Sequence, residues 1–123
     1  IQVLLVEDNE LNMEIAEFLL KEEKMIVTKA WNGREAVEIF ENSAPGYFDV
    51  ILMDLMMPVM DGYTATRKIR ELERSDAKTI PIIAMTANAF SNDVKAAFDC
   101  GMNAHLAKPV NIDRIKDIVA NFT

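Results

Sequence analysis

Side chains able to support phosphoryl chemistry stand where four apolar segments of the sequence end. Glu7 and Asp8 follow an apolar run at the start of the chain, and Asp54 closes the run that begins at Val50. Thr86 and Lys108 end two later runs. A carboxylate at the end of a buried segment costs free energy unless another group uses it. These residues are therefore candidates for a common site.

The three carboxylates would repel one another if they lay close together, and one lysine does not neutralise them. A hard divalent cation does, and Mg²⁺ prefers one or two carboxylates together with water and phosphate oxygens. Glu7 and Asp8 suit such an ion, directly or through water, and Met56 could add its backbone carbonyl. The pattern indicates a Mg²⁺ site around Asp54.

A carboxylate can also act as a nucleophile toward phosphorus and form an aspartyl phosphate. Asp54 ends the most apolar of these runs and is the natural nucleophile. Such a transfer needs cations and hydrogen-bond donors around the phosphoryl oxygens. The Lys108 ammonium and the Thr86 hydroxyl suit that role.

Five predicted strands alternate with five predicted helices along the chain. This alternation is typical of a parallel sheet with helices on both faces and right-handed crossovers, which binds ligands beyond the carboxyl ends of its strands. The acids, the hydroxyl and the ammonium should therefore converge at that edge, with none at the opposite one. The strands are predicted at 1–6, 25–30, 48–54, 80–86 and 104–107, and the helices at 9–23, 34–42, 63–74, 88–101 and from 111 or 113 nearly to the end.

The composition fits one domain, residues 1–123, with a full hydrophobic core. The net charge of −7 argues against direct nucleic-acid binding, and no apolar run is long enough to span a membrane. The single cysteine, Cys100, is expected in the core and favours a reducing cytoplasm. The chain does not begin with Met, which indicates a piece of a longer protein.

Five short motifs in this order resemble the receiver domain of two-component response regulators, over essentially the whole chain. They are Val6-Glu7-Asp8-Asn9, Met53-Asp54-Leu55-Met56-Met57-Pro58, Asp61-Gly62, Met85-Thr86-Ala87 and Ala107-Lys108-Pro109. The residues within and around these motifs are similar to those of receivers attached to hybrid sensor histidine kinases. The resemblance implies a flavodoxin-like, doubly wound five-stranded sheet of strand order 2-1-3-4-5.

The resemblance also implies roles. Asp54 would accept a phosphoryl group from a phosphohistidine, supplied by a histidine kinase or a histidine phosphotransfer domain. Glu7, Asp8 and the Met56 carbonyl would hold Mg²⁺ beside it. The domain would act only on itself, in phosphorylation and dephosphorylation, without a separate substrate. It would be cytoplasmic, alone or as part of a membrane sensor kinase, and a monomer or a weak phosphorylation-dependent dimer.

Switching follows from the same resemblance. Thr86 would move toward the phosphate, Lys108 would bond it, and the Lys108–Pro109 peptide would be cis. The fourth helix, fifth strand and fifth helix would form the output surface.

Two residues depart from the family pattern. Glu7 stands where many members have Asp, which keeps the charge but adds a methylene. His105 stands where the family often has Tyr or Phe as a rotating switch residue. His105 either takes that part, with an added pH dependence, or is a strand-end histidine without a switching role.

The first helix has two apolar stripes. Asn12, Ala16, Leu19 and Leu20 are expected to pack on the sheet. The second stripe is Leu11, Ile15 and Phe18, which either docks a helix of the phosphohistidine donor or widens the core contact.

Three other functions fit the fold class less well. A binding module that has lost phosphorylation would not need the intact set of acids and lysine. A flavin-binding protein would need a Ser/Thr/Gly-rich phosphate loop, and Glu7-Asp8-Asn9-Glu10 is acidic. A haloacid-type phosphatase would need a second acid two residues after Asp54, where Met56 stands.

Overall fold

The fold is a five-stranded parallel sheet between two layers of helices. The computed structural model describes residues 1–87, 91–108 and 110–122, apart from the side chains of residues 91–93. The sheet order is β2-β1-β3-β4-β5, as the family resemblance implied. The strands are β1 (Gln2–Val6), β2 (Ile26–Ala30), β3 (Val50–Asp54), β4 (Ile82–Thr86) and β5 (Ala104–Ala107).

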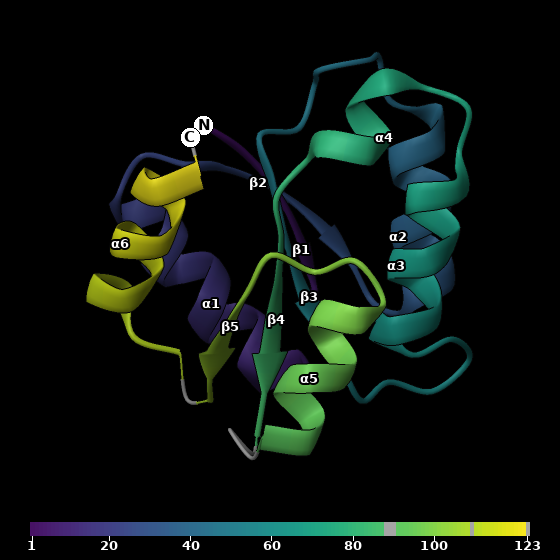
Figure 1. The fold of residues 1–123 in the computed structure, drawn as a ribbon. Helices are drawn as coiled ribbons and strands as arrows, with labels where there is room; N and C mark the ends of the chain where they lie inside the picture. Colours follow the sequence, from purple (N-terminus) through teal and green to yellow (C-terminus); the bar gives the residue numbers. More distant parts are fainter. Residues whose placement is uncertain (88–90, 109, 123) are drawn as a thin grey trace.

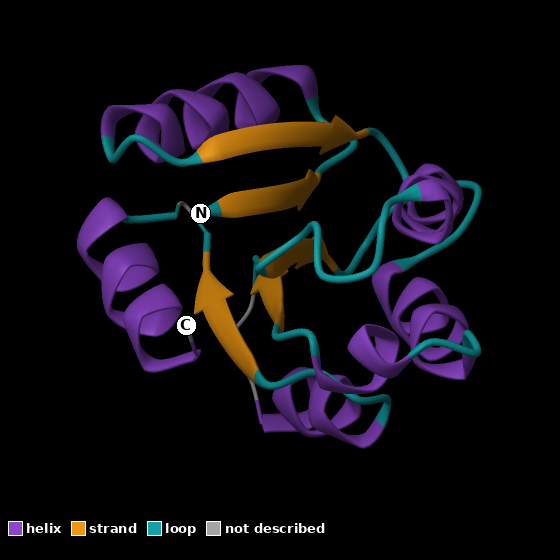
Figure 2. Ribbon diagram, turned by 90° about the horizontal axis from the view of Figure 1, so that it is seen from above, coloured by secondary structure: helices purple, strands orange, loops and turns teal. Residues whose placement is uncertain are grey.

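Helices cover both faces of the sheet, as Figures 1 and 2 show. One apolar cluster joins α1 and α6 to one face of the sheet, and a second joins α2, α3, α4 and α5 to the other. The helices are α1 (Glu10–Glu22), α2 (Gly33–Asn42), α3 (Gly62–Glu71), α4 (Ser75–Thr79), α5 (Ser91–Asp99) and α6 (Ile112–Phe122).

The strands β3 and β4 form the middle of the core, because every residue in both is buried. Alternate residues of each strand pack in the two apolar clusters. In β3, Ile51 and Met53 pack in the cluster of α2 to α5, and Val50 and Leu52 pack in the cluster of α1 and α6. A strand with apolar side chains on both faces is typical of a covered parallel sheet. Because β3 is held by packing on both faces, the position of its last residue, Asp54, at the end of the sheet is fixed.

Asn and Asp side chains begin the helices nearest the site. Asn9 Oδ1 accepts a hydrogen bond from the Asn12 backbone N–H at 2.9 Å, and Asp61 Oδ1 accepts one from Thr64 N–H at 2.8 Å. Each bond satisfies a backbone donor that the helix itself leaves unpaired, which stabilises a helix by about 1 kcal/mol. Asn9, rather than Asp8, is thus the cap of α1, and the Asp8 carboxylate is left exposed.

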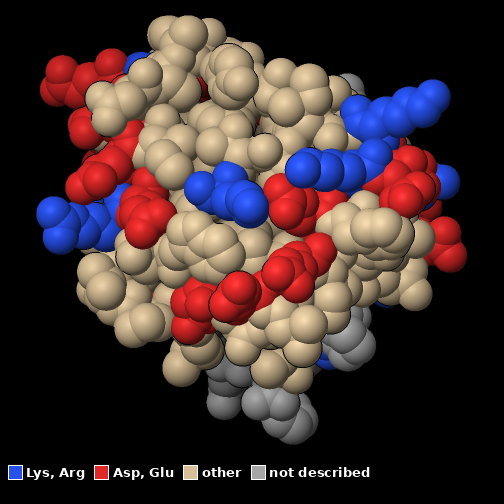
Figure 3. All heavy atoms as spheres, turned by 180° about the vertical axis from the view of Figure 1, so that it is seen from behind, with Lys and Arg blue, Asp and Glu red and all other residues tan. Residues whose placement is uncertain are grey.

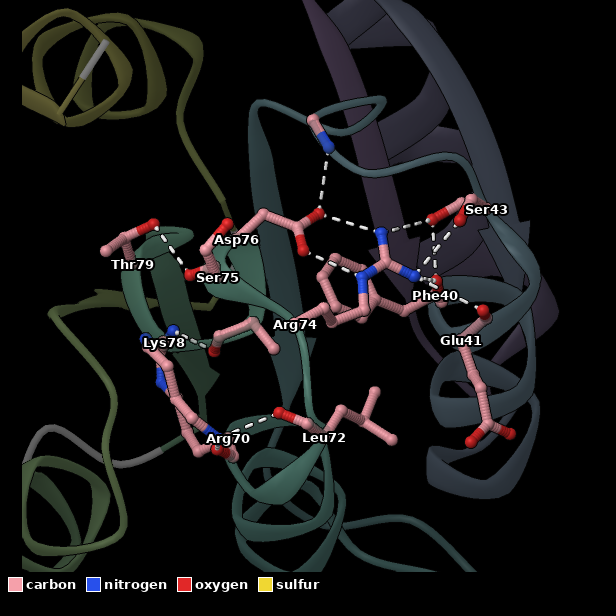
Figure 4. A network of polar contacts seen from close by, with 12 residues as sticks. Phe40, Glu41, Ser43, Arg70, Leu72, Arg74, Ser75, Asp76, Lys78 and Thr79 are labelled. Carbon is pink, nitrogen blue, oxygen red and sulfur yellow. Dashed lines mark hydrogen bonds and ion pairs between the residues drawn. The ribbon is translucent and has the colours of Figure 1, made fainter.

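The prediction of five helices was wrong, because α4 forms a sixth. Figure 4 shows how Arg74 holds this segment against the end of α2. Its guanidinium donates to both carboxylate oxygens of Asp76, at 2.7 and 2.8 Å, and to the carbonyls of Phe40 and Ser43, at 2.9 and 3.0 Å. Arg74 therefore lies outside α3, which was predicted to include it.

The buried face of α1 differs from the predicted one. Met13, Ala16 and Leu20 are buried, whereas Asn12 is exposed and Leu19 is only half-buried. Among the residues that the structure describes, no helix has the length and apolar content needed to cross a bilayer.

Candidate functional site

Three carboxylates meet at the carboxyl ends of β1 and β3. One oxygen each from Glu7, Asp8 and Asp54 lies within 4.8 Å of the other two. Glu7 and Asp54 are only 2% and 3% exposed, whereas Asp8 faces solvent. In Figure 1 this is the end of the sheet toward which the strand arrows point, away from both termini. The topology thus brings together the acids that the sequence singled out.

Lys108 lies between the two buried acids. Its Nζ is 2.8 Å from Glu7 Oε2 and 3.1 Å from Asp54 Oδ2. Its backbone N–H donates to the Thr86 carbonyl at 2.8 Å, which ties the end of β5 to the end of β4. Burial alone would lower the pKa of the Lys108 ammonium, but its bonds to Glu7 and Asp54 raise that pKa overall. Lys108 therefore stays charged at the site.

The Asp54 carboxyl is electrostatically strained. Burial, and secondarily the charge of Glu7, raise its pKa from 3.8 to about 6, although Lys108 and the Met56 N–H act in the opposite direction. The Met56 N–H donates to Asp54 Oδ1 at 3.4 Å, while the Met56 residue is 78% exposed. The raised pKa means that the ionised Asp54 carboxylate is disfavoured at this site, first because it is buried and second because Glu7 lies near it.

This charge imbalance fits a divalent cation. Three carboxylates share the site with one ammonium, which contacts only Glu7 and Asp54, and the third acid, Asp8, opens to solvent, where an ion with bound water could enter. Oxygen ligands of this kind match Mg²⁺. Glu7 has less freedom than Asp8, because its second oxygen, Oε1, accepts a hydrogen bond from the Asn9 N–H at 3.2 Å.

The residues named as switches lie on β4 and β5, the two strands that follow β3 in the sheet. Thr86 is 6% exposed at the end of β4 and lies opposite Ala107 of β5. His105 is half-buried and lies opposite Ala84. Because Leu106 belongs to the cluster of α1 and α6, His105 is on the α5 side of the sheet. Pro109, and with it the predicted cis peptide, is outside the described residues.

Gly62 helps to position the end of β3, a role that sequence reasoning missed. An added Cβ would lie 2.2 Å from the Asp54 backbone oxygen, so the first turn of α3 packs directly on the end of β3. The Gly62 N–H donates to the Leu55 carbonyl at 3.0 Å. In the sequence, Asp61-Gly62 is one of the five motifs that carry the family resemblance, without a stated structural reason. The signal was present, but the close approach is visible only in three dimensions.

Cys100 belongs to the core and not to the site. Its side chain is buried, and its Sγ lies 3.1 Å from the Ala97 carbonyl. Burial raises the pKa of the thiol, so the group is a poor nucleophile at neutral pH.

The second stripe of α1 does not widen the core. Leu11, Ile15 and Phe18 are 64%, 46% and 62% exposed. A groove beside the helix is lined by Ile15 together with Glu7 and Lys108. The exposed stripe is therefore continuous with the acidic site.

Comparison with known proteins gives the chain a family. The family described as the response regulator receiver domain matches residues 3–120. The chain is 42% identical, over 93% of its length, to hybrid signal transduction histidine kinase B of Dictyostelium discoideum. It spans 6% of the length of that kinase and 12% of the length of histidine kinase 2 of Arabidopsis thaliana.

Two solved structures share the fold and between 32% and 40% of the aligned sequence. The receiver domain of the sensor histidine kinase PA1611 from Pseudomonas aeruginosa, crystallised with a magnesium ion in its active-site cleft, is 40% identical, with a TM-score of 0.88 and coverage of 98% of this chain and 95% of that one. A second match is the crystal structure of the receiver domain of Ssk1 from Saccharomyces cerevisiae in complex with the histidine phosphotransfer protein Ypd1. The matched chain is 32% identical, with a TM-score of 0.86 and coverage of 99% of this chain and 88% of that one. Sequence, topology and site agree, and this chain belongs to the receiver domain family of two-component signalling.

Proposed function

We propose that the domain accepts a phosphoryl group on Asp54 from a phosphohistidine, with Mg²⁺ held by Glu7, Asp8, Asp54 and the Met56 carbonyl. The observation that carries the proposal is the placement of Asp54. Its buried carboxylate shares one site with two further acids and lies 3.1 Å from the Lys108 ammonium. The Mg²⁺ in the cleft of the PA1611 receiver supports the metal.

In the proposed reaction an oxygen of the ionised Asp54 carboxylate attacks phosphorus. The P–O bond to Asp54 forms as the P–N bond to the donor imidazole breaks, and the imidazole leaves with the bonding electron pair. Mg²⁺ supplies charge neutralisation for the phosphoryl oxygens. Lys108, already 3.1 Å from Asp54 Oδ2, supplies the second cation, and the Thr86 hydroxyl supplies a donor. Hydrolysis of the acyl phosphate by water would return Asp54 to its carboxylate.

Phosphorylation would act as a switch through charge. The new group adds negative charge and acceptor oxygens next to Thr86, which ends β4, and Lys108, which directly follows β5. Their backbones are joined by the Lys108 N–H bond to the Thr86 carbonyl, so a shift at one strand end reaches the other. We propose α5, β5 and α6 as the output surface, with His105 of β5 as the switch residue.

The donor is proposed to dock on α1. The stripe of Leu11, Ile15 and Phe18 is exposed beside the groove that leads to Glu7 and Lys108. The complex of the Ssk1 receiver with Ypd1 supports a phosphotransfer protein as the kind of partner. We further propose that residues 1–123 are one receiver domain of a longer cytoplasmic or membrane-attached histidine kinase, and that the domain alone is a monomer or a weak dimer.

The test is phosphorylation of the purified domain with acetyl phosphate and Mg²⁺, followed by intact mass spectrometry. We expect a gain of one phosphoryl group that requires Mg²⁺ and is absent in Asp54→Asn. A gain that persists in the variant would assign the chemistry to another residue. No gain, under conditions that label the PA1611 receiver domain, would favour a binding module that has lost phosphorylation.

A further inference from the structure

The exposed stripe of α1 has an acidic rim. Glu14 lies three residues after Leu11 and four before Phe18, and Glu22 lies four after Phe18, so both are surface neighbours of the stripe. Both are exposed, and neither forms an ion pair with any residue that the structure describes. Figure 3 shows acidic side chains beside uncharged surface on this side of the molecule.

Two neighbouring acids, by contrast, form ion pairs within the domain. Glu17 pairs with Lys21 at 3.2 Å and with Lys29 at 3.6 Å, and Glu23, just beyond the helix, pairs with Lys116 at 3.6 Å. Glu14 instead stands four residues after Glu10, a spacing at which like charges destabilise a helix. Glu14 and Glu22 therefore place negative charge that has no ion-pair partner among the described residues directly beside the exposed apolar stripe.

We infer that the partner helix on this stripe carries lysine or arginine opposite Glu14 and Glu22, so that charge selects the phosphohistidine donor. This inference rests on the proposed docking and adds the chemistry of the partner. Apolar contact with Leu11, Ile15 and Phe18 supplies affinity that is indifferent to charge. The acidic rim adds discrimination, because a basic flank is attracted and an acidic flank is repelled.

The same charges argue against the other occupants of an apolar helix face. In a symmetric dimer the same patch meets itself, which would bring the two acidic rims together. An anionic membrane surface would be repelled for the same reason. The net charge of −7 adds a long-range attraction for a basic partner that weakens as salt rises.

The experiment uses two synthetic helical peptides with the same Leu-rich face, one flanked by Lys and the other by Glu. Their binding to the domain is measured by fluorescence anisotropy at low and high salt. We expect the Lys-flanked peptide to bind about tenfold more tightly, because two surface ion pairs replace two repulsions. The difference should shrink at high salt, where the screening length becomes short.

Variants of the domain locate the effect. Glu14→Lys/Glu22→Lys should invert the preference, and Glu14→Gln/Glu22→Gln, which perturbs folding less, should abolish it. Glu71→Lys/Glu73→Lys makes the same change in net charge near the end of α3, on the other side of the sheet, and should retain the preference. Leu11→Ser/Phe18→Ser should weaken binding of both peptides.

Equal affinity for both peptides would overturn the inference, as would an equal loss of preference in the Glu71 and Glu73 control. Concentration-dependent dimerisation of the free domain that Leu11→Ser/Phe18→Ser removes would assign the face to a second copy instead. The proposed function is tested separately by acetyl phosphate, which is too small to need the α1 surface. If Asp54 is labelled but the two peptides bind equally well, only the inference of a basic partner helix is contradicted, and the proposed function stands.

Discussion

The Lys108 ammonium lies 3.1 Å from Oδ2 of Asp54, and at the same time 2.8 Å from Oε2 of Glu7. One cation thus serves two carboxylates that are 5% and 3% exposed in their side chains. Removing one member of such a cluster leaves buried charge without compensation, which costs more than the pair itself contributes.

Lys108→Met should therefore lower the free energy of unfolding by about 2 kcal/mol in metal-free buffer at pH 8. Mg²⁺ should restore part of this loss, because the ion can replace the missing positive charge at the same carboxylates. Urea denaturation followed by circular dichroism measures both effects. Lys68→Met, at an exposed position of α3, is the control and should change stability little. Equal losses in the two variants would contradict the compensating role of Lys108.

The pKa of Asp54 gives the domain a pH dependence of known sign. Its folded-state pKa of about 6 lies above the ordinary value of 3.8, so the folded protein binds the proton more tightly than the unfolded one. The protonated carboxyl favours folding at low pH, and this advantage is lost as pH rises through 6. Above that pH, in the absence of metal, the ionised carboxylate costs stability.

Asp54→Asn should accordingly be more stable than the natural sequence at pH 8 by about 2 kcal/mol, because asparagine carries no charge at this buried position. The advantage should shrink as pH falls through 6 and vanish near pH 4. Thermal melts in EDTA across this range measure the difference. Asp117→Asn, at an exposed position of α6, should give no such profile. A gap that is constant with pH would mean that the Asp54 pKa is not raised.

The strand ends that carry the site were predictable from sequence. The carboxyl ends of all five strands lie at the predicted residues, Val6, Ala30, Asp54, Thr86 and Ala107. At four of these ends the apolar run stops at a residue of the site: Glu7, Asp54, Thr86 or Lys108. The amino ends of β3 and β4 were placed two residues too early, since Phe48 and Ile80 remain buried before the strands begin. Apolar character reports burial, and it does not separate a strand from the buried loop that leads into it.

The helix α4 and the core face of α1 were not predictable in the same way. Ser75–Thr79 is short and mostly polar, so it has no apolar period, and it depends on the tertiary contacts of Arg74. In α1, apolar residues lie on both sides of the helix, and sequence alone did not show that Met13 rather than Asn12 meets the sheet. The roles proposed for the site residues came from their chemistry and from the family resemblance, and they remain predictions.

Gly62→Ala should damage both stability and the site. The new Cβ would lie 2.2 Å from the Asp54 backbone oxygen, so α3 or the end of β3 must move. We expect a loss of about 2–3 kcal/mol, as for other overpacked positions, together with slower labelling by acetyl phosphate. The control is Gly46→Ala, where a Cβ meets nothing within 4 Å but φ is +79°. That variant should lose only about 1 kcal/mol of backbone energy, with labelling intact. Equal labelling in the two variants would show that the close approach does not position Asp54.

Thr66 presents a different kind of core residue. Its side chain is fully buried on α3, and its Oγ1 has no hydrogen-bond partner among the described residues. A buried hydroxyl without a partner loses its hydrogen bonds to water and gains none in return. Its Cγ2, by contrast, contributes apolar packing, and it would lie 3.7 Å from a Cβ built at Gly101.

Thr66→Val should therefore raise the free energy of unfolding by about 1 kcal/mol, because it removes the unpaired hydroxyl and keeps the shape of the side chain. Thr66→Ala removes the hydroxyl and the methyl group together, so the lost packing offsets the gain and this variant should be no more stable than the natural sequence. Urea denaturation of both variants separates the two contributions. Destabilisation by valine of 1 kcal/mol or more would mean that the hydroxyl is hydrogen-bonded in solution, and that the α3 backbone or a buried water is its partner.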